Sequence, residues 1–82
     1  MNYTEKALEK ALNNRNWQIR REAYRALGYT EKAFDDEHCN IRQEAYCILG
    51  YTEKALSDED SDIREEAEIY FQQKKLREGK CE

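Results

Sequence analysis

The chain has 82 residues, of which 39% are hydrophobic and 39% charged, with a net charge of −4 and no proline. A domain of this length buries only about 60% of the surface that its unfolded form exposes, which excludes a deep catalytic cavity. Helix formers outnumber strand formers, so we expect an all-α protein that acts through its surface.

Three segments repeat one another at an interval of 22 residues. Each contains Glu-Lys-Ala and an apolar residue, then a polar loop, and then Ile-Arg and Glu-Ala. Intervals of about 20–50 residues mark stacked supersecondary units, so we expect one domain over residues 1–82. Its expected parts are the start of an N-terminal helix (1–8), three repeats (9–30, 31–52 and 53–72) and a basic C-terminal tail (73–82).

Inside each repeat, apolar residues recur at positions i, i+4, i+7 and i+8, which lie on one face of a helix. The pattern therefore predicts one helix in each repeat, with this face buried. The predicted faces are Ile19, Ala23, Ala26 and Leu27; Ile41, Ala45, Ile48 and Leu49; and Ile63, Ala67, Tyr70 and Phe71.

The residues after Gly28 and Gly50 decide whether a repeat holds one long helix or two. The apolar phase continues past Gly28, which permits one long helix. Glycine, however, is favoured just past a helix C-terminus, and threonine is a good N-cap. We favour the break, with Thr30 as the cap of a short second helix. Tyr29 and Phe34 then occupy the positions of a hydrophobic staple, while Tyr24 and its repeat equivalents lie at the edge of the core.

The repeats resemble short HEAT-like helical repeats. Leu56–Arg64 has the form L-x-D-x-D-x-x-I-R, and Ile41–Gly50 has the form I-R-x-x-A-x-x-x-L-G. The resemblance covers about residues 9–72 and implies an α-solenoid that binds proteins. It also implies that a loop aspartate and the arginine after the β-branched residue link neighbouring repeats. The matching residues are Asp36 and Asp58 with Arg42 and Arg64, and, as a weaker match, Asn14 with Arg20. The repeats here are shorter than those of the family, so the second helix must be very short.

The segment Arg21–Phe34, REAYRALGYTEKAF, also resembles small repeat proteins of T4-like bacteriophages, among them proteins of lysis inhibition. This resemblance implies a non-enzymatic accessory factor in the host cytoplasm. Its implied partner is the cytoplasmic segment of a phage holin, which would recruit the chain to the inner membrane.

The candidate protein-binding surface combines Trp17 with Arg20, Arg21 and Arg25, because tryptophan and arginine are enriched at binding hot spots. Trp17 opens a predicted helix where the other repeats have cysteine or serine, so stacking of the repeats does not require it. The alternative is that Trp17 covers the open end of the first repeat.

Charge is distributed unevenly along the chain. Residues 1–28 carry +3, residues 29–50 carry −3, residues 51–68 carry −6, and residues 69–82 carry +2, which sum to −4. Phosphate binding needs a continuous positive surface, so this distribution disfavours a nucleic-acid partner. It suits a protein partner or head-to-tail association, and a self-assembling structural protein is therefore the alternative function.

Metal and thiol chemistry has little support. His38 and Cys39, with Cys47, are too few for a structural zinc site, which needs four ligands, and the sequence has no CxxC. The acidic loop Asp58–Asp62 lacks the glycine and the bidentate glutamate of a calcium-binding EF-hand loop. We therefore expect no enzyme activity and no cofactor.

The sequence favours a cytoplasmic location. Its longest stretch without a charged residue, Ala45–Thr52, has eight residues, far fewer than the roughly 20 that cross a bilayer. The first residues lack the basic and apolar regions of a signal peptide. Three cysteines form no paired framework, as expected in a reducing compartment.

Overall fold

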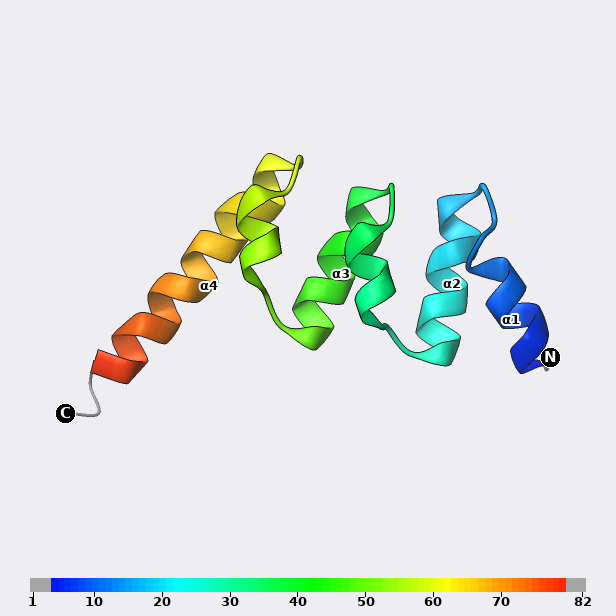
Figure 1. The fold of residues 1–82 in the computed structure, drawn as a ribbon, viewed down its shortest axis with the longest axis horizontal. Helices are drawn as coiled ribbons and strands as arrows, with labels where there is room; N and C mark the ends of the chain where they lie inside the picture. Colours follow the sequence, from blue (N-terminus) through cyan, green and yellow to red (C-terminus); the bar gives the residue numbers. More distant parts are fainter. Residues whose placement is uncertain (1–3, 80–82) are drawn as a thin grey trace. The chain divides into compact units, whose positions relative to one another are not determined.

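The computed structural model describes the backbone of residues 4–79 and the side chains of residues 4–76. Over this range the protein is all-α, as predicted, and contains no strand (Figure 1). It divides into two compact units, Met1–Leu49 and Gly50–Glu82, which we describe separately.

Unit 1 begins with α1 (Glu5–Ala11) and α2 (Trp17–Leu27), which pack against each other. A 3₁₀ helix, η1 (Glu31–Asp35), follows and packs against α3 (Cys39–Leu49). Unit 2 contains a second 3₁₀ helix, η2 (Glu53–Ser57), packed against the longer helix α4 (Ser61–Gly79). Each 3₁₀ helix and the α-helix after it are joined by a short loop (Figure 1).

The predicted helix breaks at Gly28 and Gly50 are confirmed. The two glycines have φ angles of 101° and 106°, values that side chains with a Cβ rarely adopt. The N–H of Gly28 still donates to the carbonyl of Tyr24 at 2.7 Å, which ends α2. A five-residue 3₁₀ helix then follows each turn, in line with the very short second helix expected from the repeat length.

The predicted threonine cap after each break is wrong. Thr4 does cap α1, since its hydroxyl accepts from the N–H of Ala7 at 3.1 Å. Thr30 and Thr52 precede the 3₁₀ helices but make no side-chain cap bond. In a single 3₁₀ turn, the N–H that a hydroxyl would cap already donates to the threonine carbonyl; from Ala33 to Thr30 this distance is 2.9 Å.

Both residues of the predicted hydrophobic staple take part in aromatic stacking. The ring of Tyr29 stacks on that of Tyr24 with 5.3 Å between centroids, and Phe34 stacks on Tyr46 at 4.4 Å. Both pairs link a segment outside the α-helices to a helix, so the rings stabilise tertiary packing.

The buried faces of α2 and α3 contain the predicted alanines and also the residue that follows each of them. Ala23, Ala45 and their neighbours Tyr24 and Tyr46 are buried, so the prediction that these tyrosines lie at the edge is wrong. Ile41, Ile63 and Ala67 are buried as predicted. Several other residues of the predicted faces are exposed: Ile19, Ala26, Ile48 and Leu49.

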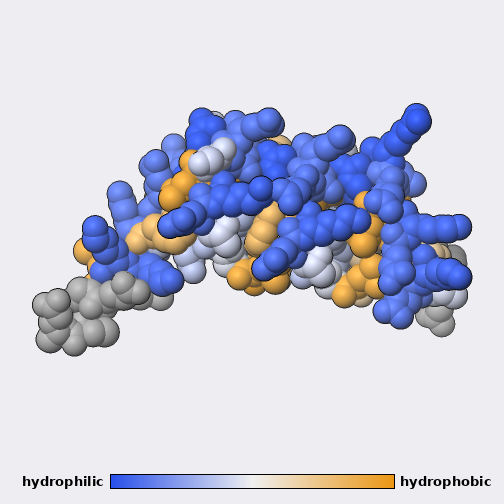
Figure 2. Space-filling model, in the orientation of Figure 1, coloured by the Kyte–Doolittle hydropathy of each residue, from blue (hydrophilic) through white to orange (hydrophobic). Residues whose placement is uncertain are grey.

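The last turn of α3 is exposed. Its residues Ile48 and Leu49 are 62% and 46% exposed, although η1 packs against α3. Polar side chains cover most of the surface in Figure 2, and apolar residues emerge between them. None of the described helices has the length and hydrophobicity that crossing a bilayer would require.

Candidate functional site

The arginines of the three Ile-Arg pairs each hold the loop that precedes their own helix. In Arg20, Arg42 and Arg64 alike, Nη1 donates to the backbone carbonyls of the residues six and five positions earlier, over 2.6–3.1 Å. This contact satisfies carbonyls that the loop cannot pair within its own backbone.

The same loops contain a second repeated contact. Side-chain oxygens of Asn14, Asp36 and Asp58 accept from the N–H two residues later, at 2.8–2.9 Å. Two positions further on, the next polar side chain accepts in the same way and starts the α-helix; in the second loop this acceptor is Nδ1 of His38, 3.1 Å from the N–H of Asn40. The polar residues that recur in the loops therefore fix the loop shape and the helix starts.

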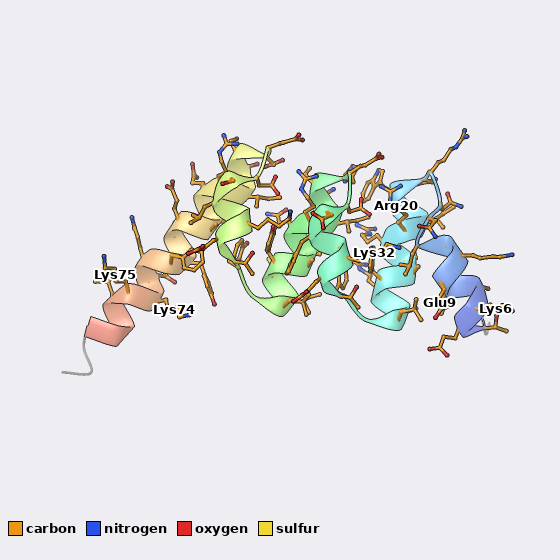
Figure 3. All side chains as sticks on the ribbon, viewed as in Figure 1. Lys6, Glu9, Arg20, Lys32, Lys74 and Lys75 are labelled. Atoms are coloured by element: carbon orange, nitrogen blue, oxygen red, sulfur yellow. The ribbon has the colours of Figure 1, made fainter. Side chains whose placement is uncertain are left out.

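Arg20 also binds Asp36, sixteen residues away. Figure 3 labels Arg20 on α2. Its Nε donates to Oδ2 of Asp36 and its Nη2 to Oδ1, both at 2.9 Å, and the two side chains are 11% and 6% exposed. The pair joins α2 to the loop before α3, between two predicted repeats. The Asp36 carboxylate is thus paired with Arg20, which was the weaker match to the family pattern. Arg42 donates instead to the backbone carbonyl of Asp36.

This pairing changes the pKa values of both Arg20 and Asp36. The hydrogen bonds to Asp36 raise the pKa of Arg20 above its ordinary value. Burial of the Asp36 carboxyl opposes its ionisation, but the hydrogen bonds from Arg20 and from the N–H of His38 outweigh burial and lower its pKa. Asp36 is therefore a stable carboxylate at neutral pH.

Glu44 on α3 collects a second set of contacts. Its carboxylate accepts from the Tyr29 hydroxyl and from Nη2 of Arg25 at 2.9 Å, and Nη1 of Arg21 lies 4.0 Å away. Burial opposes ionisation of Glu44, but these hydrogen bonds lower its pKa. Burial, together with the hydrogen bond to Glu44, raises the pKa of Tyr29 to about 12.

Trp17 begins α2, as predicted, and is half-buried. Its ring stacks on His38 with 3.8 Å between centroids and 12° between planes, and the Arg21 guanidinium lies 5.2 Å from the indole centroid. The ring thus lies toward the loop of the second predicted repeat. Trp17 and Arg21 are in contact, and Arg21 and Arg25 both reach Glu44.

The structure separates the four predicted binding residues. Trp17, Arg21 and Arg25 form one cluster with His38 and Glu44, which we call the Trp17 cluster. Arg20 lies apart from it, 9% exposed and bound to Asp36, so its guanidinium has little surface to offer a partner. The sequence pattern did not indicate Glu44 as a member, although Glu-Ala recurs at this position in every repeat.

The described residues contain no group of three histidine, cysteine or acidic side chains arranged to hold a metal ion. A depression of about 390 Å³ lies between the loop before α2 and η1. Three bases and three acids line it, among them Arg15, Lys32 and Asp35. This mixed lining gives no net field that would favour a charged substrate. Residues 80–82, part of the predicted basic tail, lie outside the described range.

We expect the free energy of unfolding to fall at both ends of the pH scale. The carboxyls of Asp36 and Glu44 have lowered pKa values, so their contribution is present above their unfolded values of about 4 and is lost as the pH falls through the folded ones. Tyr29 has a raised pKa, so its contribution is complete below about pH 10 and is lost as the pH rises toward 12.

Urea unfolding at a series of pH values, followed by circular dichroism, tests this profile. The Tyr29→Phe variant has no phenol to ionise, so it should lose less stability between pH 10 and 12 than the original chain. An equal alkaline loss in both proteins would contradict the assignment to Tyr29.

No protein-family model, curated protein or solved structure matches this chain.

Proposed function

We propose that the chain is a protein-binding module without enzyme activity, built as a short HEAT-like α-solenoid. The support for the architecture is the recurrence of contacts at intervals of 22 residues. The arginine that holds its own loop occurs in both units. A hydrogen bond from a tyrosine hydroxyl to a glutamate also occurs in both units. Tyr29 donates to Glu44 in unit 1, and Tyr51 donates to Glu66 at 2.6 Å in unit 2.

The observation that carries the binding function is the Trp17 cluster. Stacking on His38 holds the indole, Glu44 accepts a hydrogen bond from Arg25 at 2.9 Å, and Arg21 lies between the indole ring, at 5.2 Å, and Glu44, at 4.0 Å. Side chains ordered in this way lose less conformational entropy when a partner binds. Arg25 is still 52% exposed, so a partner can reach it. Tryptophan and arginine in this setting are typical of an interaction hot spot.

The partner we propose is the cytoplasmic segment of a phage holin, and the proposed role is to support lysis inhibition. The support is the resemblance of residues 21–34 to small repeat proteins of T4-like phages. In this proposal the chain acts in the host cytoplasm and reaches the inner membrane only through its partner.

Isothermal titration calorimetry with the purified holin segment tests both the proposed partner and the proposed binding surface. We expect Trp17→Ala to raise the Kd by about tenfold or more, because it removes the aromatic centre of the cluster. Arg25→Ala should have a smaller effect in the same direction. Lys10→Ala removes one positive charge from exposed α1 and is the matched control, with an unchanged Kd.

The outcomes distinguish a wrong partner from a wrong binding surface. If the segment gives no heat of binding, the holin is not the partner. If it binds equally well to the Trp17 and Arg25 variants, the cluster is not the binding surface. Sedimentation velocity of the chain alone addresses the alternative, because a self-assembling structural protein would form larger species as its concentration rises.

A further inference from the structure

Arg20 uses the two edges of its guanidinium for different purposes. Nη1 holds the carbonyls of its own loop, at 2.7 and 3.1 Å. Nε and Nη2 hold both oxygens of Asp36, which lies in the next loop along the chain. One arginine therefore shapes its own loop and also binds a carboxylate from a neighbouring segment in the fork geometry that suits arginine.

Arg64 in unit 2 makes the first of these contacts and lacks the second. Its Nη1 donates to the carbonyls of Asp58 and Glu59 at 2.6 and 3.0 Å, so the side chain is held as Arg20 is. Among the described side chains, no carboxylate pairs with its Nε or Nη2, and Arg64 is exposed.

Two other positions of unit 2 are also more exposed than their equivalents in unit 1. Leu56 is 39% exposed, whereas Phe34, at the same place in the preceding repeat, is 8% exposed. Glu68 is an exposed residue where α2 and α3 have the buried Tyr24 and Tyr46. In unit 1 the corresponding positions are covered by packing; in unit 2 they form a surface, which we call the Arg64 face.

We propose that the Arg64 face binds another protein through a single aspartate. Its two carboxylate oxygens would accept from Nε and Nη2 of Arg64, as those of Asp36 accept from Arg20. This inference deepens the proposed binding function and rests on it. Residues 51–68 carry a net charge of −6, and Glu68 lies one turn from Arg64. A polyanion would be repelled there, so the aspartate belongs to a segment that is otherwise neutral or basic.

A second copy that stacked on Arg64 through its first loop would not supply this group. The first loop has Asn14 at the position that Asp36 occupies in the second. The Asn14 side-chain oxygen accepts from the N–H of Asn16 at 2.8 Å, as the Asp36 oxygen does for His38. Its remaining terminal atom is the amide nitrogen, a donor, which cannot accept from Nε of Arg64. The first loop of another copy therefore does not complete the Arg64 face as Asp36 completes the binding of Arg20.

The test is a titration of the intact chain with sodium acetate, followed through the Nε–H signals of its arginines by NMR at constant ionic strength. Acetate presents one carboxylate and requires no partner protein, so this result is independent of the holin experiment. We expect the Arg64 signal to shift along a saturating curve, with an apparent Kd about three- to tenfold below that of Arg15, because the Arg64 side chain is already ordered. Arg15 is exposed, and its guanidinium has no contact with a described side chain. Nε and Nη2 of Arg20 already donate to Asp36, so the Arg20 signal should not shift on addition of acetate.

Equal responses of Arg64 and Arg15 would overturn the proposal, as would a response of Arg20 larger than that of Arg64. Arg64→Lys removes the Arg64 signal and so assigns it in the spectrum, while the Arg20 signal should stay in place, which shows that unit 1 is still folded. Lys75→Ala, on the same helix, removes the same charge as Arg64→Ala would and should leave the Arg64 response unchanged. A lost response in Lys75→Ala would show that net charge, not the arginine fork, attracts acetate.

Discussion

Replacing Asp36 with alanine should lower the free energy of unfolding by about 3 kcal/mol. The change removes both oxygens that Arg20 binds and leaves a guanidinium that is only 11% exposed without its counter-charge. It also removes the acceptor that shapes the loop before α3. Urea unfolding followed by circular dichroism measures the loss. Glu37→Ala is the control, since it removes one acidic side chain from the same loop at an exposed position and should change stability by less than about 0.5 kcal/mol.

A double variant separates charge burial from loop shape. In Arg20→Leu combined with Asp36→Leu no buried charge remains, so part of the lost stability should return. Recovery should be incomplete, because the carbonyls of Asn14 and Arg15 also lose their donor. If Asp36→Ala costs no more than the Glu37 control, the pair is not a stabilising link between α2 and the loop before α3.

Gly28→Ala should destabilise the protein by about 2 kcal/mol. A Cβ added at Gly28 would meet no atom within 4 Å, so the whole cost comes from holding alanine at a φ of 101°. Gly50→Ala should cost a similar amount, because its Cβ would lie 3.9 Å from the Tyr70 hydroxyl, an ordinary contact. The midpoint of urea unfolding measures both losses.

Thr30→Ala is the control for the turn at Gly28. It adds no strained backbone angle, and the Thr30 hydroxyl makes no cap bond, so the midpoint should move little. A loss at Thr30→Ala as large as at Gly28→Ala would show that the segment is sensitive to any substitution. Full stability of Gly28→Ala would show that the turn can form with negative φ.

The sequence was sufficient for features that depend on local geometry. The break at Gly28 follows from the positive φ angle that glycine adopts easily and other residues rarely adopt. The helix starts follow from the polar residues that recur in the loops. The burial of Tyr24 depended instead on what packs against α2. Tyr24 lies about 100° around the helix from the predicted core residue Ala23, and helical periodicity alone could not show that both are buried. The partner of Asp36 was also beyond local reasoning, because Arg20 approaches it from sixteen residues away.

The Trp17–His38 stack determines what optical measurements of this protein report. The chain has one tryptophan and one histidine, and they lie face to face in unit 1. Intrinsic indole fluorescence therefore reports on one contact between α2 and the loop before α3, and on nothing within unit 2. Circular dichroism at 222 nm sums the helices of both units. Melting curves from the two signals coincide only if the units unfold together, so a mismatch between them would show directly that the two halves of this small chain melt as separate bodies.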